Sequence, residues 1–290
     1  MKPNPDFSPA LLRMKLPTPR KVTVKQVTDL SPRMRRVTFV SDQFDGIESP
    51  LPGAHIKLFF VAEDFDWTTM DIATIRSSAP GRTYTPRALR PESGEVDVDF
   101  MLHGDGVAAN WVANAAPGQH LVFAGPRGGF SPEETADKFV LVADETAIPA
   151  ASMILEEAGN DRILKIILEV EDRQEERPLT DRVVHHPLWL HRSTAGNTAP
   201  GDKLIGEVCR AAEEHPDAFW WVACESSIMR RIRETLLARY EIAPEKMLTR
   251  GYWLRQRVDY PDNDYGDNAA KGHGSLAPHR LAYPNDKTDG

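Results

Sequence analysis

The stretch from Arg82 to Phe130 constrains the fold more than any other part of the chain. It opens with residues 82–87 (RTYTPR), where the proline excludes helix and favours an extended backbone. Residues 96–102 then alternate between apolar and acidic side chains, which predicts a half-buried strand. The stretch therefore begins with two predicted strands. The first of them carries a cation, a ring and hydroxyl groups suited to a phosphate and a planar ligand.

The second strand runs into a glycine-containing turn and a short helix. Residues 103–106 (HGDG) precede small residues and a tryptophan at 107–111 (VAANW), and the helix is expected to end at Pro117. Its first backbone N–H groups can receive an anion. A further strand, 120–124, ends in the turn 125–130 (GPRGGF), where backbone can approach a planar ligand closely. Together these pieces predict a dinucleotide cradle outside the usual Rossmann pattern.

Short strands separated by turns precede this cradle. The patterns of residues 21–27, 35–40 and 55–61 predict three strands. With the strands of the cradle they predict an antiparallel β-barrel over residues 21–132, in which no helix is needed before Val107. The acidic segment 63–81 is expected to be a surface loop. Residues 1–20, which contain five prolines, are expected to form an irregular lead-in.

The pattern changes after Phe130. The continuous apolar run 138–143 is typical of a strand buried on both faces of a parallel sheet. Strand and helix patterns then alternate, which predicts a Rossmann-like, doubly wound α/β domain over residues 138–257. The expected helices are 151–158, 204–213 and 227–240, and the expected strands are 164–170, 188–190, 218–223 and 248–254. Residues 258–290 are polar and are expected to form a disordered or loosely docked tail.

The second domain lacks a glycine-rich phosphate loop. Its first strand is followed by residues 144–150 (DETAIPA), in which Thr146 is expected to cap the next helix and Pro149 to lie in its first turn. The start of that helix, at the carboxyl end of the strand, still suits a phosphate or a nicotinamide. We therefore expect a nucleotide site there with a weaker grip on the pyrophosphate.

Composition and charge exclude some classes of function. A net charge of −8 argues against a nucleic-acid partner, and it requires a local basic patch for any anionic substrate. The two cysteines, Cys209 and Cys224, lack C-x-x-C spacing, which favours a reducing compartment and no protein-built metal centre. No apolar run reaches membrane-spanning length, and the N-terminus lacks a signal pattern. We expect a cytoplasmic protein without a membrane span, and nothing in the sequence suggests more than a monomer.

The order and spacing of these motifs resemble the siderophore-interacting protein family. That family consists of FAD-dependent ferric-siderophore reductases related to ferredoxin-NADP reductase. The resemblance covers about residues 20–255. It is carried by the segments 31–39 (SPRMRRVTF), 51–60 (LPGAHIKLFF), 82–85 (RTYT), 103–111 (HGDGVAANW), 125–128 (GPRG), 144–150 (DETAIPA), 189–192 (WLHR), 221–233 (WVACESSIMRRIR) and 251–253 (GYW).

The resemblance implies an FAD site on the barrel and a pyridine-nucleotide site on the second domain. Arg82 would contact the FAD diphosphate, Tyr84 would pack against the flavin ring, and Thr85 would lie at the reactive edge of the ring. Trp253 is equally well explained as a core residue. The residues placed at FAD or at the nucleotide are Arg82, Thr83, Tyr84, Thr85, Leu102, His103, Gly106, Val107, Ala108, Ala109, Asn110, Trp111, Asp144, Thr146, Glu225, Tyr252 and Trp253.

The resemblance also implies that Lys57 and Arg127 hold the anionic ferric siderophore. From the residues alone, Lys57 is equally a solvent-facing strand residue. A flavin couples a two-electron nicotinamide donor to a one-electron ferric acceptor, and reduction to Fe(II) loosens the complex with hard oxygen ligands. The electron donor stays open between NADPH, NADH and ferredoxin. The candidates for binding a 2′-phosphate are Arg173, Arg192 and Arg230.

Two departures from the family pattern limit the resemblance. The family commonly has Ala-Gly-Glu where this chain has Ala223-Cys224-Glu225, and it often has proline or glycine in place of Val107. Cys224 follows an apolar strand and is expected to pack rather than to act as a redox thiol. Two other functions remain open. One is a flavin or electron-transfer reductase on the same scaffold, and the other is a non-catalytic siderophore- or flavin-binding protein.

Overall fold

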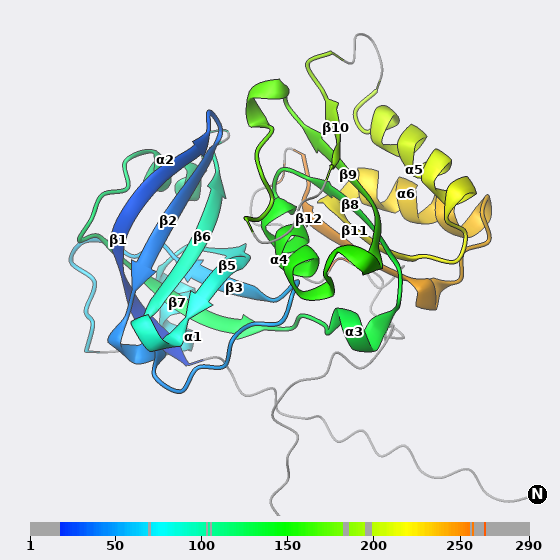
Figure 1. The fold of residues 1–290 in the computed structure, drawn as a ribbon. Helices are drawn as coiled ribbons and strands as arrows, with labels where there is room; N and C mark the ends of the chain where they lie inside the picture. The colour runs from blue at the N-terminus through cyan, green and yellow to red at the C-terminus, as the bar shows by residue number, and fades with distance from the viewer. Residues whose placement is uncertain are drawn as a thin grey trace, which may run out of the picture.

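The computed structural model describes residues 18–68, 71–102, 104, 106–181, 186–194, 199–255, 257 and 264. They form a β-barrel followed by an α/β domain, side by side (Figure 1). This architecture confirms the fold class predicted from the sequence, while the predicted domain boundaries remain predictions. His103, most of the predicted lead-in and nearly all of the predicted tail lie outside the described residues.

The barrel is a single antiparallel sheet in the order β4-β3-β7-β1-β2-β6-β5. Its strands are β1 (Pro19–Ser31), β2 (Met34–Val40), β3 (His55–Phe59), β4 (Gly81–Tyr84), β5 (Pro86–Arg90), β6 (Glu95–Met101) and β7 (His120–Arg127). The edge strands β4 and β5 are consecutive in sequence, with only Thr85 between them. One stretch of chain thus pairs with β3 by its first half and with β6 by its second, which closes the sheet.

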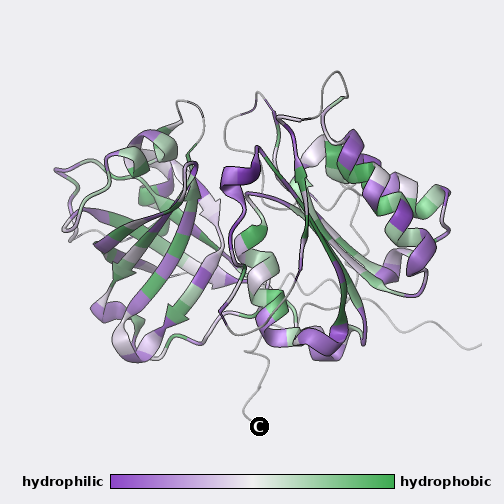
Figure 2. Cartoon of the chain, turned by 45° about the horizontal axis from the view of Figure 1, so that its top comes forward, coloured by the Kyte–Doolittle hydropathy of each residue, from purple (hydrophilic) through white to green (hydrophobic). Residues whose placement is uncertain are grey.

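The barrel strands alternate between interior and exterior positions, as Figure 2 shows in the mixed hydropathy along them. In β3, Ile56 and Leu58 are 0% exposed in the barrel core, whereas His55 and Lys57 are half-buried. Because successive side chains of a strand point to opposite faces, His55 and Lys57 lie on the outer face. The strand period therefore places both basic residues outside the core.

Helix α1 (Ile72–Ser78) lies in the segment that was expected to be a surface loop, so that prediction was wrong. Asp71 caps it by accepting N–H groups of the first turn. Ile72 and Ile75 pack on Phe59 and Val122 of the outer barrel face. The helix has only two buried residues, so its period was too short to detect, and its capping acid looked like a surface charge.

The second domain is a five-stranded parallel sheet in the order β10-β9-β8-β11-β12. Its elements are α3 (Pro132–Thr135), β8 (Phe139–Asp144), α4 (Ile148–Ala158), β9 (Ile163–Val170), β10 (Leu188–His191), α5 (Asp202–Glu214), β11 (Phe219–Glu225), α6 (Ser226–Ala238) and β12 (Met247–Trp253). Helix α4 packs on one face, toward the barrel, and α5 and α6 pack on the other (Figure 1). The strand order runs from β8 outward to β9 and β10 on one side and from β11 to β12 on the other. The carboxyl ends of β8 and β11 therefore form the switch point, where ligands of such sheets bind.

Short 3₁₀ helices complete the described structure. They are η1 (Asp42–Phe44), η2 (Pro91–Ser93), η3 (Asn160–Arg162), η4 (Arg173–Glu175) and η5 (Pro244–Lys246).

Helix α4 begins three residues earlier than predicted, and Thr146 does not cap it. The N-cap residue is Ala147, and the Thr146 hydroxyl donates instead to Asp144 Oδ1 at 2.5 Å. A buried carboxylate is a strong acceptor, so it takes the hydroxyl from the helix start. Pro149 does lie in the first turn, as predicted.

Buried polar contacts fix the two domains against each other. Glu175 of η4 is 1% exposed and accepts hydrogen bonds from the Ser31 hydroxyl at 2.5 Å and the Arg33 backbone N–H at 3.1 Å. Arg87 of β5 forms a bidentate pair with Glu156 of α4, with distances of 2.6 and 3.1 Å. The relative placement of the two domains is therefore defined by these contacts.

We expect Glu175→Ala to lower the free energy of unfolding by about 2 kcal/mol, because it leaves two donors of the barrel without an acceptor. Urea denaturation followed by tryptophan fluorescence measures the change. The exposed Glu157 on α4 supplies the matched control. Its alanine variant should stay within about 0.5 kcal/mol of the parent protein. Equal losses in the two variants would contradict the role given to Glu175.

Candidate functional site

The predicted ligand strand is β4, at the seam where the barrel closes. Its Arg82, Thr83 and Tyr84 are half-buried, and Thr85 at the junction with β5 is 7% exposed. The Tyr84 ring packs against Phe100 with 4.5 Å between centroids, and burial raises the pKa of its hydroxyl. The strand thus presents a fixed, neutral ring next to an arginine.

The predicted anion-binding turn leads into helix α2 (Val107–Ala113). Its N-cap is Gly106, and no described side chain caps its first N–H groups. A Cβ built on Gly106 would meet nothing within 4 Å, and the same holds at Gly104. The two glycines therefore have room beside them, and the first N–H groups of α2 have no side-chain cap, as a diphosphate would require.

Trp111 is turned toward the barrel core. It stacks on Phe39, with 6.0 Å between ring centroids and 15° between ring planes, and it meets Phe60 edge-on at 5.7 Å. Leu102, Val107 and Ala108 pack against the same cluster. These side chains anchor α2 on the barrel, and a direct contact of Trp111 with a ligand remains a prediction.

Asp144, at the end of β8, is hydrogen-bonded to the ends of β11 and β12 at the switch point. It is 3% exposed. Its carboxylate accepts hydrogen bonds from the Thr146 backbone N–H at 2.9 Å, the Glu225 backbone N–H at 2.9 Å and Trp253 Nε1 at 2.8 Å. Burial, and then the charge of the neighbouring Glu145, raises the pKa of Asp144 to about 6. Trp253 is thereby fixed at this end of the sheet.

The Glu225 carboxylate is hydrogen-bonded to the helix that follows it, α6. Its Oε2 accepts the backbone N–H groups of Ser227 at 2.8 Å and Ile228 at 3.0 Å, which caps α6. Burial alone would raise the pKa of Glu225, but these hydrogen bonds and that of the Ser227 hydroxyl lower it. The carboxylate therefore stabilises the helix start, and any contact with a nucleotide would have to share it.

Tyr252 and Thr85 meet across the domain boundary. Burial raises the pKa of the Tyr252 hydroxyl, and the nearby Thr85 side chain opposes this rise. The last strand of the α/β domain therefore reaches the ligand strand of the barrel. Two residues that the sequence assigned to one site do come together.

Four basic residues lie close to β4, the strand that is predicted to contact the ligand. Lys57 pairs with Thr83 in the register of β3 and β4, and a Cβ on Gly81 would lie 2.8 Å from Lys57 Cε. The lysine side chain thus crosses the glycine of the ligand strand. Arg127 is opposite His55 in the register of β7 and β3. Arg250 of β12 places its Nη2 atom 3.4 Å from His55 Nδ1. We call His55, Lys57, Arg127 and Arg250 the basic group.

Sequence analysis missed His55 and Arg250. The two are 195 residues apart in the chain and come from different domains. Strand periodicity gave a signal, because His55 shares the outer face with Lys57, and Arg250 is two residues before Tyr252 on β12. That signal could not show that β12 returns to the barrel.

The sheet is acidic near the end of β10. Arg192 forms an ion pair with Glu145 at 2.8 Å, and its guanidinium lies 3.6 Å from Glu169 and from Glu171. Burial lowers the pKa of Arg192, but Glu145, Glu169 and Asp144 outweigh it and raise the pKa. An arginine held by three carboxylates is poorly suited to bind a further 2′-phosphate.

The raised pKa of Asp144 predicts a pH dependence of stability. Its folded-state pKa of about 6 exceeds the usual 3.8, so the stabilising protonation is lost as pH rises between these values. Relative to Asp144→Asn, the free energy of unfolding of the parent protein should fall by about 3 kcal/mol from pH 4 to pH 7. Urea denaturation at each pH measures this difference. A flat difference would contradict the raised pKa of Asp144.

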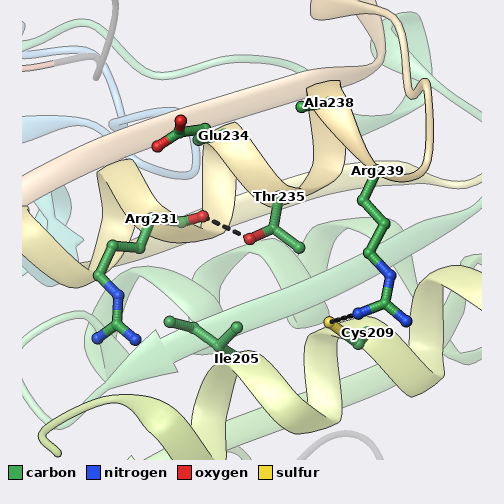
Figure 3. Close-up of a pocket in the computed structure, with 7 residues that line it drawn as sticks. All are labelled: Ile205, Cys209, Arg231, Glu234, Thr235, Ala238 and Arg239. Carbon is green, nitrogen blue, oxygen red and sulfur yellow. Dashed lines mark hydrogen bonds between the residues drawn. The ribbon is translucent and has the colours of Figure 1, made fainter.

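A separate cavity of about 450 Å³ lies between α5 and α6, on the outer side of the sheet (Figure 3). Its lining residues are Ile205, Cys209, Arg231, Glu234, Thr235, Ala238 and Arg239. Arg239 Nη1 lies 3.9 Å from Cys209 Sγ, and Arg231 pairs with Asp202 at 2.6 Å. None of the predicted site residues lines this cavity, so it is distinct from the predicted site.

Among the described helices, none is both long and apolar enough to cross a bilayer.

Comparison with known proteins gives matches over both domains. Residues 23–130 match the family model of the siderophore-interacting FAD-binding domain, which supports the FAD cofactor predicted for the barrel. Residues 136–256 match the model of the siderophore-interacting protein. The two matches together cover most of the chain.

Several relatives are similar in sequence. Ferric vibriobactin reductase ViuB of Vibrio cholerae is 27% identical over 82% of this chain and 90% of that protein. The NADPH-dependent ferric-chelate reductase of Escherichia coli is 26% identical over 81% of this chain and 92% of that protein. An uncharacterized protein of Mycobacterium tuberculosis is 33% identical, and the match spans 60% of this chain and 65% of that protein.

Solved structures share the fold. A siderophore utilization protein from T. fusca has a TM-score of 0.69 and 29% identity, covering 84% of this chain and 95% of its own. The siderophore-interacting protein SipS from Aeromonas hydrophila has a TM-score of 0.67 and 26% identity, covering 83% and 94%. Phthalate dioxygenase reductase, at 12% identity, a TM-score of 0.57 and coverage of 78% and 66%, shares the fold alone.

Proposed function

This chain belongs to the siderophore-interacting protein family, as its motifs predicted, and from that premise we propose that it is a ferric-siderophore reductase. FAD would carry electrons from NADPH or NADH to the Fe(III)-siderophore, releasing Fe(II). One observation carries the proposal: the strand Arg82–Thr85 and the basic group, drawn from both domains, lie next to each other. The names of the Vibrio cholerae and Escherichia coli relatives, both reductases of ferric chelates, support it.

The residues around β4 fit FAD. Arg82 and the uncapped start of α2 suit the diphosphate, Tyr84 offers a ring for the isoalloxazine, and Thr85 offers a hydroxyl close to Tyr252. When bound, FAD takes two electrons from a hydride donor and passes them singly to ferric ions. The protein itself binds and orients the reactants, so we assign it no acid-base pair.

The basic group suits an anionic ferric siderophore. The chain carries a net charge of −8, so its overall field opposes such a substrate. Lys57, Arg127 and Arg250 reverse that field locally, beside the strand proposed to hold the flavin edge. No side chain needs to ligate the iron, because the chelator does so, and Fe(II) binds its hard oxygen ligands less tightly.

The switch point of the α/β domain suits the electron donor. We place the nicotinamide nucleotide near Asp144, Thr146, Glu225, Tyr252 and Trp253, at the carboxyl ends of β8, β11 and β12. Reduced ferredoxin is the alternative donor. We further propose that the protein acts as a monomer in the cytoplasm.

An anaerobic matrix of donors and acceptors tests this function. The FAD-loaded protein is titrated with NADPH, NADH or reduced ferredoxin, and then with ferric siderophore, free flavin or a quinone. At least one donor should bleach the flavin, and ferric siderophore should restore its colour. Recovery only with free flavin or quinone would favour a flavin or electron-transfer reductase. A flavin that no donor bleaches would favour a non-catalytic siderophore- or flavin-binding protein.

A further inference from the structure

An acidic residue from beyond the last strand is bound at the start of α6. The Asp264 carboxylate accepts a hydrogen bond from the Ser226 hydroxyl and pairs with Arg230 Nη2 at 2.9 Å. Its backbone carbonyl accepts the Gly251 N–H at 2.8 Å. The Asp264 side chain is 8% exposed and that of Arg230 is 42% exposed, so a buried acid meets a partly exposed arginine.

The site is built around this anion. Arg230 Nη1 donates to Ser226 Oγ at 2.8 Å, which orients the hydroxyl toward the carboxylate. A Cβ on Gly251 would lie 2.5 Å from Asp264 Oδ2 and 2.8 Å from Ser226 Oγ, so only glycine leaves room for the acid. Glycine within a strand often marks such a close approach.

The chemistry of the site is that of a phosphate site. Guanidinium and hydroxyl donors are usual partners of phosphate. Glu225 already accepts the first backbone N–H groups of α6, so the donors offered to a further anion are the side chains of Ser226 and Arg230. Helix α6 has 13 residues and begins at Ser226. A carboxylate in this position satisfies the same donors with less charge.

The site adjoins the region proposed for the electron donor. Ser226 follows Glu225, whose backbone N–H binds Asp144 at the switch point. Gly251 pairs with Cys224 in the register of β11 and β12 and directly precedes Tyr252. A nucleotide whose nicotinamide lay near Tyr252 would have its phosphates within reach of this end of the sheet.

We propose that Ser226 and Arg230 form a phosphate-binding site for the donor nucleotide, and that Asp264 occupies it in the ligand-free chain. The proposal rests on the proposed function in one respect, namely that the donor is a nucleotide. One anion exchanges for another at the site, and no covalent bond changes. Asp264 thereby sets the affinity for the donor by competing with its phosphate.

Removal of the carboxylate should strengthen phosphate binding. The probes are inorganic pyrophosphate and ADP, titrated by calorimetry into the FAD-loaded protein and its Asp264→Asn variant. If Asp264 occupies the site nine-tenths of the time, the variant should bind both probes about tenfold more tightly. Asp217→Asn is the matched control, because Asp217 is 96% exposed and pairs with Lys246 at 3.0 Å, remote from the site. It should bind like the parent protein.

Arg230 supplies the second arm of the test. In the Asp264→Asn background, Arg230→Ala should abolish the gain in affinity, and the KM for NADPH or NADH should follow the same order. Equal affinities in the parent protein and Asp264→Asn would overturn the proposal, as would a gain that survives Arg230→Ala. Calorimetry needs no electron transfer. Tighter ADP binding by a variant that reduces no ferric siderophore would support the site while contradicting the proposed function.

Discussion

The Arg82→Ala variant is expected to purify without colour, with an affinity for FAD lowered about 100-fold. A hydrogen bond from a guanidinium to a diphosphate contributes about 1.5 to 3 kcal/mol, and the variant loses it together with the positive charge. Quenching of flavin fluorescence, with FAD titrated into the apoprotein, measures the affinity. Circular dichroism checks that the variant remains folded.

Arg90→Ala is the matched control for Arg82→Ala. Arg90 lies on β5, the other half of the strand that closes the barrel, where it pairs with Glu95 at 3.1 Å and Asp97 at 3.0 Å. Its variant removes an arginine from the same seam without touching the proposed diphosphate site. It should bind FAD within about twofold of the parent protein. A yellow Arg82→Ala protein with parental affinity would refute the assignment of Arg82.

Charge reversal in the basic group should impair the second half of the reaction. For Lys57→Glu or Arg127→Glu, kcat/KM for an anionic ferric siderophore should fall about 100-fold. Replacing attraction by repulsion at a separation of several ångströms costs about 3 kcal/mol in a partly exposed site. A colorimetric Fe(II) trap measures turnover. Reduction of the flavin by its donor should change less than about twofold.

Two comparisons separate this effect from general damage. Lys246→Glu reverses a charge in η5, where Lys246 pairs with the exposed Asp217 and not with the basic group, and it should leave turnover unchanged. The deficits of Lys57→Glu and Arg127→Glu should shrink as salt is added, because salt screens partly exposed charges. Unchanged kcat/KM in both variants would contradict the assignment of the substrate to the basic group.

Most of the fold could be predicted because it follows from periodicity. Alternating strands gave the barrel, and continuous apolar runs between helical patterns gave the parallel sheet. The errors came where a local pattern competed with burial. Helix α1 buries only Ile72 and Ile75, and the Thr146 hydroxyl turns to the buried Asp144 rather than to the helix start. Neither the burial of α1 nor the hydrogen bond of Thr146 can be read from the local sequence, because both depend on neighbouring strands.

The site was only partly predictable, because local motifs describe single elements. The motifs located β4 and α2, but they did not show that the Trp111 ring packs on Phe39. They also could not bring Arg250 to His55, because that contact depends on how two domains pack. Long-range contacts of this kind follow from the tertiary structure.

The most direct test of the account is a single turnover that bypasses the electron donor. The FAD-loaded protein is reduced by light under argon and then mixed with excess ferric siderophore in the presence of an Fe(II) trap. If reduced FAD passes its electrons to the ferric siderophore, the oxidised flavin should return. About two Fe(II) should form per FAD, because each ferric ion takes one of the two electrons. A flavin that stays reduced, with no Fe(II) formed, would contradict the account.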